Sequence, residues 1–393
     1  MESLQVRAYK TLADLEGLRA SWEGLLAEFC GATTFSSWEW LVPWWRAFGD
    51  DRQLLVLAFV DPTGRLVGLA PLSVELRSLT SGVNQRVLRL LGDGSGDSDN
   101  LDFPVRAGYE DQIACMLLDY LARESNLWDC CELNTMPADS AVGKCLERQL
   151  GARDWVTYRH QNSGSVVSMG ETWEGYLAQL SAKERTKIAY RRKLLEKKYR
   201  VRIYRCEDRD RVSACLTTLF DLHQKRWQNV GEPGSFSSAA RRQFYGELAS
   251  LLLERGYLQF WFLDLDGQPV AAQFGFQFGS TVFSLQEGYD PDYSSDSVGY
   301  VLRAHVIHQL ISEGVQRYDF LAGDGSSKSR WSAQASNYVN LHFARPHTSG
   351  SLFLQLIDGA SVGKEWLRRH LPRNLWQALH WLNCKLGGTR KGL

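Results

Sequence analysis

The stretch LQFWFLDLDGQPVAAQFGFQFGSTVFSLQEGY, residues 258–289, holds apolar runs rich in aromatic and β-branched residues. Asp266-Gly267 separates the first two runs, and this dipeptide in such a setting is a strong hairpin signal. We expect an antiparallel meander that the run at 281–289 completes. Helical periodicity at about 297–313 and the pattern RYDFL at 317–321 follow, which predicts a helix and then another strand.

The order of elements around this meander occurs twice in the chain. A strand and two helical patterns at 200–255 precede the meander, and the first half opens with a strand, two helical patterns and a hairpin over 4–76. We therefore predict an α/β (α+β) fold in which two similar units have mixed, mostly antiparallel sheets flanked by helices. The expected division is a first domain at 1–165, a second domain at 166–347 and a helical C-terminal extension at 348–393.

The composition is typical of a folded globular protein. The 393 residues are 44% apolar and 12% aromatic, which is enough for two cores. The 45 basic and 45 acidic side chains balance, so the chain as a whole has no bulk attraction to nucleic acid or anionic lipid. The eight cysteines include no CxxC pair and no zinc-type Cys/His spacing, so we expect reduced thiols and no metal. No leader pattern and no run of 18 apolar residues occurs, which predicts a cytoplasmic protein without stable membrane insertion.

A strand, two helices, an antiparallel meander, a helix and further strands form the order of the GNAT acyltransferase fold. Four blocks sharpen this match: FSSWEWLVPWWRAFG, LRLLGDGSGDSDNLDF, LFDLHQKRWQNVGEPGSFSSAARRQFYGELA and YDFLAGDGSSKSRW. In this order they resemble the signature blocks of the bacterial CelD/BcsL-like (BioF2-like) acetyltransferases, which are tandem-GNAT proteins distantly similar to the FemAB peptidyltransferases. The resemblance spans roughly residues 35–345.

The resemblance implies two tandem GNAT-like domains, of which the second binds the acyl donor. It also implies acyl transfer from acetyl-CoA or another acyl-CoA to an amine or a hydroxyl. Members are commonly assigned to polysaccharide or envelope biosynthesis, so the implied acceptor is a small molecule or a glycan precursor such as an amino sugar. Two alternatives stay open: a FemAB-like transferase with an aminoacyl-tRNA donor, and a catalytically silent scaffold of a polysaccharide system.

A GNAT donor site opens where two neighbouring parallel strands diverge, and here those strands are 281–289 and 317–321. The donor pyrophosphate is expected at the start of the following helix, where backbone N–H groups are unpaired. The usual Gln/Arg-x-x-Gly-x-Gly/Ala loop is missing, and Ser297 as the cap of an ordinary helix is the alternative. The candidate donor-binding residues are Ser297, Val298, Gly299 and Tyr300.

The turn at 318–331 carries the main catalytic candidates. We expect Lys328 to stabilise the negative charge of a tetrahedral intermediate, because a fixed ammonium favours an oxyanion. Asp319 lies on the preceding strand, where it can position an acceptor amine or pair with Arg330. The family block also carries this Lys, although Ser327 stands where Tyr is usual. Alternatively, Asp324 pairs with Lys328 or Arg330 and only shapes the turn.

Two residues compete for the role of general base. Glu287 ends a strand beside the expected opening. His223 shares a helical face with Arg226 and Trp227, because three and four residues separate them. The expected substrate contacts are Arg226, Trp227, Asp324, Arg330 and Trp331.

Charge is concentrated in two further segments. The helical pattern at 183–200 holds nine basic residues against Glu184 and Glu196. It is either a solvated face or a site for phosphates of a sugar nucleotide, of the CoA ribose, of a lipid-linked glycan or of tRNA. The loop at 92–102 is either a turn or a site for a cationic or hydroxyl-rich acceptor; its acids are Asp93, Asp97, Asp99 and Asp102.

Overall fold

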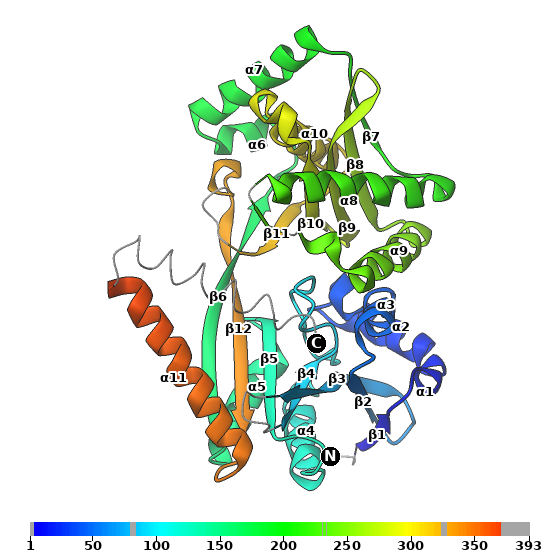
Figure 1. Cartoon of the computed structure of the whole chain (residues 1–393). Coiled ribbons are helices and arrows are strands. Elements are labelled where there is room, and N and C mark those ends of the chain that lie inside the picture. Colours follow the sequence, from blue (N-terminus) through cyan, green and yellow to red (C-terminus); the bar gives the residue numbers. More distant parts are fainter. Residues whose placement is uncertain (1–3, 79–83, 230, 233, 324–327, 371–393) are drawn as a thin grey trace.

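The computed structural model describes residues 4–78, 84–229, 231–232, 234–323 and 328–370. Its strands form one twelve-stranded mixed sheet in the order β1-β2-β3-β4-β5-β12-β6-β11-β10-β9-β8-β7. Helices flank this sheet, and the two halves of the chain lie at its two ends (Figure 1). The α/β prediction of two GNAT-like units with mixed sheets is therefore confirmed.

The first half contains the elements that the sequence predicted, with one helical pattern divided in two at Gly17. Its elements are β1 (Gln5–Tyr9), α1 (Leu12–Glu16), α2 (Arg19–Glu28), η1 (Thr34–Ser36), α3 (Trp38–Phe48), β2 (Arg52–Val60), β3 (Leu66–Ser78), β4 (Asn84–Leu90), α4 (Glu110–Arg123), β5 (Cys130–Pro137), α5 (Ala141–Ala152) and β6 (Val156–Ser168).

The second half contains the predicted meander, with Asp266 and Gly267 both at positive φ in its first turn. Its elements are α6 (Trp173–Gln179), α7 (Ala182–Lys198), β7 (Val201–Arg205), η2 (Arg209–Arg211), α8 (Val212–Gln228), η3 (Ser235–Ser237), α9 (Ala239–Glu254), β8 (Leu258–Leu265), β9 (Gln268–Phe278), β10 (Thr281–Tyr289), η4 (Pro291–Asp296), α10 (Val298–Ser312), β11 (Arg317–Ala322), η5 (Ser329–Trp331), β12 (Gln334–Ala344) and α11 (Ser349–His370).

Two long strands join the halves. β12 from the second half pairs with β5 of the first half, and β6 pairs with β11 of the second half. β6 and β12 also pair with each other over eleven residues, and Figure 1 shows them side by side along the molecule. The predicted boundary between residues 165 and 166 falls inside β6. Each half thus completes its sheet with a strand from the other half.

Each half has one pair of parallel strands that separates after three paired residues. In the second half β10 and β11 pair from Thr281↔Arg317 to Phe283↔Asp319, and then diverge. A bulge in β10 after Ser284 and the left-handed backbone of Leu321, with φ at 63°, turn the two strands apart. This is the opening that the sequence predicted.

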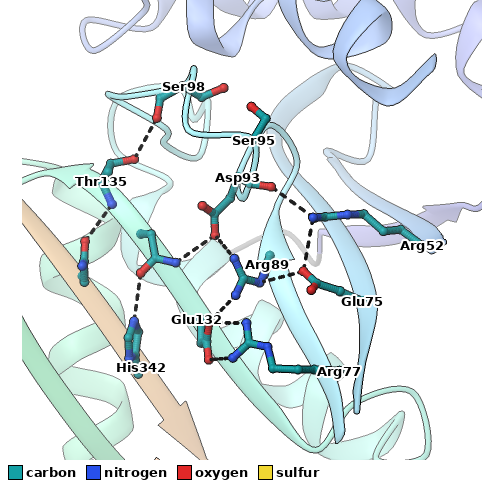
Figure 2. Close-up of polar contacts among 12 residues, drawn as sticks. Arg52, Glu75, Arg77, Arg89, Asp93, Ser95, Ser98, Glu132, Thr135 and His342 are labelled. Atoms are coloured by element: carbon teal, nitrogen blue, oxygen red, sulfur yellow. Dashed lines mark hydrogen bonds and ion pairs between the residues drawn. The ribbon is translucent and has the colours of Figure 1, made fainter. Parts of the chain in front are cut away.

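The corresponding opening of the first half, between β4 and β5, is filled by ion pairs. Arg89 donates to Glu132 at 2.6 Å and to Asp93 at 3.0 Å, while Arg77 binds both carboxylate oxygens of Glu132. Asn134 of β5 donates to Asp93 at 2.8 Å across the space between the strands, and Arg52 of β2 extends the network to the other side of β4 (Figure 2). The opening in the first half is therefore occupied by side chains. No described helix is long and apolar enough to span a bilayer.

Candidate acyltransferase site

A cavity of about 420 Å³ lies where β10 and β11 diverge, between the start of α10 and η5. It brings together most of the residues that the sequence singled out, and adds Tyr289, Ser294 and Arg303. The predicted residues that line it are Arg226, Glu287, Ser297, Val298, Gly299, Tyr300, Arg330 and Trp331. We call this space the donor cavity.

The floor of the donor cavity is the N-terminus of α10. Ser297 occupies the N-cap position with left-handed backbone angles and makes no side-chain cap bond, so the alternative that its hydroxyl caps an ordinary helix is wrong. The N–H groups of Val298 and Gly299 occupy the first helical positions, where no intrahelical acceptor exists. A Cβ built at Gly299 would meet only the Tyr289 ring, at 3.9 Å. The space above these two donors is therefore open, as an anion would require.

Glu287 lines the donor cavity and forms an ion pair with Arg303, a residue that the sequence analysis missed. The Arg303 guanidinium also lies 5.0 Å from the ring centroid of Phe320 and 5.7 Å from that of Trp331. Burial lowers the pKa of Arg303, but Glu287 and Tyr318 outweigh it and hold this pKa above its usual value. A cation thus stays fixed at the back of the cavity. In the sequence, the one feature that points to Arg303 is its position one helical turn after Gly299.

Lys328 directly precedes η5, and its ammonium group lies against main-chain oxygens at the end of β11. The Nζ atom donates to the carbonyls of Phe320, Leu321 and Ala322 at 3.2, 3.2 and 3.4 Å. Burial lowers the pKa of Lys328, and the nearby carboxylates of Asp319 and Asp99 act in the opposite direction. The ammonium is half-buried and close to charges from both halves of the chain.

Asp319 faces a second cavity, of about 430 Å³, at the seam between the halves. Its carboxylate accepts the N–H of Leu321 at 2.7 Å. Burial, and to a smaller extent the neighbouring Asp99, raise the pKa of Asp319 to about 6, although the Leu321 N–H, Lys328 and Arg317 act in the opposite direction. We call this space the seam cavity; its lining is Thr33, Asn100, Pro137, Ala138, Asp139, Val166, Thr281, Phe283, Arg317, Asp319, Ser336, Asn337 and Tyr338.

The seam cavity shares Thr33, Thr281, Phe283 and Arg317 with a larger cavity of about 570 Å³. Because they share lining residues, the two cavities are adjacent along the seam. An acceptor with its reactive group near Asp319 would therefore have room to extend beyond the seam cavity.

The acidic loop of the first half reaches across to β11. Asp99 accepts the N–H of Ala322 at 3.0 Å, and burial raises its pKa. Asp97 is fully buried and binds Arg241 of α9 at 2.9 Å and the Tyr245 hydroxyl at 3.0 Å. This loop is therefore more than a turn: it fixes a carboxylate beside Lys328.

His223 and Trp227 lie outside the lining of the donor cavity, although Arg226 beside them takes part. The His223 Nε2 accepts the indole N–H of Trp227 at 2.9 Å, and its ring is buried. Burial, followed by Arg226 and Arg241, lowers the pKa of His223 to about 4. Helical spacing placed the three residues correctly on one face, but it did not reveal that α8 packs His223 inward. Asp324 lies outside the described residues.

Comparisons with known proteins agree with this geometry. Residues 182–329 match the profile of a family described as "Acetyltransferase (GNAT) domain". This part of the chain has a GNAT acyltransferase fold. The match includes β10, α10 and β11, and contains every residue that lines the donor cavity except Arg330 and Trp331.

Several solved structures share the fold at low sequence identity. FemX is 11% identical with a TM-score of 0.61, over 89% of this chain and 99% of FemX. A protein of unknown function from Bacteroides thetaiotaomicron is 14% identical with a TM-score of 0.52, over 83% and 97% of the two chains. The C-terminal domain of a putative lysylphosphatidylglycerol synthetase from Agrobacterium fabrum is 8% identical with a TM-score of 0.51, over 86% and 95%. A search of curated proteins finds no match.

Proposed function

We propose that the protein transfers an acetyl or other acyl group from acyl-CoA to an amine, by direct attack on the thioester. The observation that carries this proposal is the divergence of β10 and β11, which has an anion-accepting helix N-terminus on one side and a carboxylate-lined cavity on the other. Donor and acceptor can then approach the same gap from opposite faces of the sheet.

The donor cavity suits the phosphates of CoA. The N–H groups of Val298 and Gly299 can donate to the oxygens of a pyrophosphate, and the guanidinium groups of Arg226 and Arg330 line the same space. Glu287 neutralises Arg303, so the net charge of the cavity still favours an anion. The thioester end lies toward the strands, where residues of β10 beyond Ser284 have no partner on β11.

The seam cavity suits a cationic acceptor. Asp319 attracts the ammonium, and its raised pKa makes it an effective base for removing a proton near neutral pH. The amine nitrogen then forms a bond to the thioester carbon, negative charge develops on the carbonyl oxygen, and the CoA thiolate leaves. Lys328 is electrostatically coupled to Asp319 of the seam cavity and to Arg303 and Glu287 of the donor cavity, and its charge would stabilise this oxygen. Glu287 is held by Arg303 and is assigned to the donor side, not to proton transfer.

We further propose that the acceptor is an amino sugar or a related envelope precursor. The similarity of the four sequence blocks to CelD/BcsL-like proteins supports this proposal, as does the combined room of the seam cavity and the larger cavity beside it. The aminoacyl-tRNA alternative and the scaffold alternative become outcomes of the test below.

The test is a thermal-shift titration of the protein with acetyl-CoA, longer acyl-CoAs and aminoacyl-tRNA. A ligand that binds only the folded state raises Tm by mass action. At a ligand concentration of one hundred times Kd, it adds about 3 kcal/mol to the free energy of unfolding. Stabilisation by acyl-CoA that is lost in the Gly299→Trp variant supports the proposal, because an indole there would fill the donor cavity. Stabilisation by aminoacyl-tRNA alone would support the FemAB-like alternative, and no shift with any donor would support a scaffold.

A further inference from the structure

The basic helix α7 lies directly beside the donor loop. Arg191 donates to the carbonyl of Ser295 at 3.0 Å, and Lys198 pairs with Asp296 at 2.6 Å. On the other side of the loop, the Tyr300 hydroxyl donates to Glu184 at 2.7 Å. α7 is therefore fastened to η4 and to the start of α10, the elements that form the floor of the donor cavity.

Two cations of α7 face this loop. The Lys187 ammonium lies 4.6 Å from the ring centroid of Tyr300, which itself lines the donor cavity. Arg191 follows Lys187 by four residues, so both side chains project from the same face of the helix. Both are half-buried against their neighbours, whereas Lys193 and Lys197 are exposed.

The charge of α7 exceeds what its own contacts neutralise. The helix holds eight basic and two acidic residues. Glu196 pairs with Arg192 at 2.9 Å, and Glu184 is shared between the Tyr300 hydroxyl and Lys187, which is 3.8 Å away. Lys187 and Arg191 thus keep much of their charge for a ligand next to the donor loop.

We propose that the face of α7 carrying Lys187 and Arg191 binds the 3′-phosphate of the CoA donor. This inference rests on the proposed function, because it assumes that the pyrophosphate lies at Val298 and Gly299. In CoA the ribose 3′-phosphate follows the pyrophosphate, so it comes next to the elements that flank the loop. A phosphomonoester carries nearly two negative charges near pH 7 and suits two converging cations.

The position of α7 favours the CoA 3′-phosphate over the other anions that the basic residues of this helix could bind. Its polar contacts lead to η4 and α10, on the donor side of β10 and β11. The seam cavity, where an acceptor such as a sugar nucleotide would lie, is lined by other elements. The protein therefore selects free CoA thioesters over pantetheine donors that lack the 3′-phosphate.

The test compares acetyl-CoA with 3′-dephospho-acetyl-CoA by isothermal titration calorimetry at fixed salt. Three proteins are used: the wild type, the double variant Lys187→Gln/Arg191→Gln, and the control Lys193→Gln/Lys197→Gln, which loses the same charge from the exposed side. We expect the wild type to bind the dephospho ligand on the order of thirtyfold more weakly. The double variant should bind both ligands with similar Kd, and the control should keep at least a tenfold preference.

Each failure has a separate meaning. Equal binding of the two ligands by the wild type would overturn the inference and leave the proposed function standing. Full discrimination by the double variant would also overturn it, because the phosphate would then lie elsewhere. If the wild type binds neither ligand, the donor assignment itself falls, and this inference falls with it.

Discussion

Replacing Asp319 with Asn should remove activity and stabilise the fold at the same time. The carboxylate is 8% exposed, and its pKa rises from 3.8 to about 6, mainly through burial. Ionising such a group in the folded state costs about 3 kcal/mol relative to the unfolded chain. Asn is neutral and similar in shape, and its amide oxygen can still accept the Leu321 N–H. The variant therefore avoids this cost and keeps the local hydrogen bond.

The gain in stability has a definite pH dependence. Below about pH 3 the wild-type acid is protonated in both states, so the wild type and the variant should unfold with similar free energies. As the pH rises from about 3 to about 6 the unfolded state ionises first and the wild type loses stability. Above about pH 7 the difference is constant, with Asp319→Asn up to about 3 kcal/mol more stable. Equilibrium urea denaturation at about pH 3, 5 and 8 measures this difference.

The activity of the same variant completes the test. Loss of a general base costs on the order of a hundredfold or more, and the wild-type rate should rise with pH with a midpoint near 6 as Asp319 loses its proton. Asp210→Asn, which changes an exposed acid on η2, is the control and should match the wild type in both assays. Wild-type activity in Asp319→Asn would refute its role as base. Lower stability of that variant at pH 8 would refute the burial argument.

Three further variants test neighbouring contacts. Lys328→Ala should lower kcat about a hundredfold, because an oxyanion partner is lost; steady-state kinetics within threefold of wild type would exclude that role. Glu287→Gln removes the negative charge beside Arg303 but keeps an amide oxygen as acceptor, so urea denaturation should show a loss of about 1 kcal/mol, together with a higher KM for acyl-CoA. Unchanged stability would show that the pair is solvated. Asp97→Ala leaves Arg241 unpaired at the seam and should cost about 3 kcal/mol and lower kcat, since the loop carrying Asp99 loosens; a pure stability loss with normal kcat would refute the positioning role.

Much of the donor side could be predicted from local sequence. The meander, the helix that follows it and the strand after that helix depend on periods of 2 and 3.6 residues and on turn chemistry. These patterns put Glu287, the segment 297–300 and Trp331 at one opening, where the structure also places them. Local pattern was insufficient for Ser297, whose left-handed backbone is set by the η4 turn before it.

The acceptor side could not be predicted in the same way. Asp319, Lys328 and Asp99 come together only because the first-half loop reaches β11, more than two hundred residues away in the chain. His223 is a second example. Helical spacing predicts which residues share its face of the helix, but it does not predict that other elements bury that face.

The sequence by itself determined the two runs of elements and their turns, because these depend on neighbours within a few residues. Only the tertiary structure decided that β6 and β12 exchange partners between the halves, that ion pairs fill the first opening, and that the second stays open. The reason is physical: strand order and burial come from contacts between distant segments, and no local pattern records which segments meet.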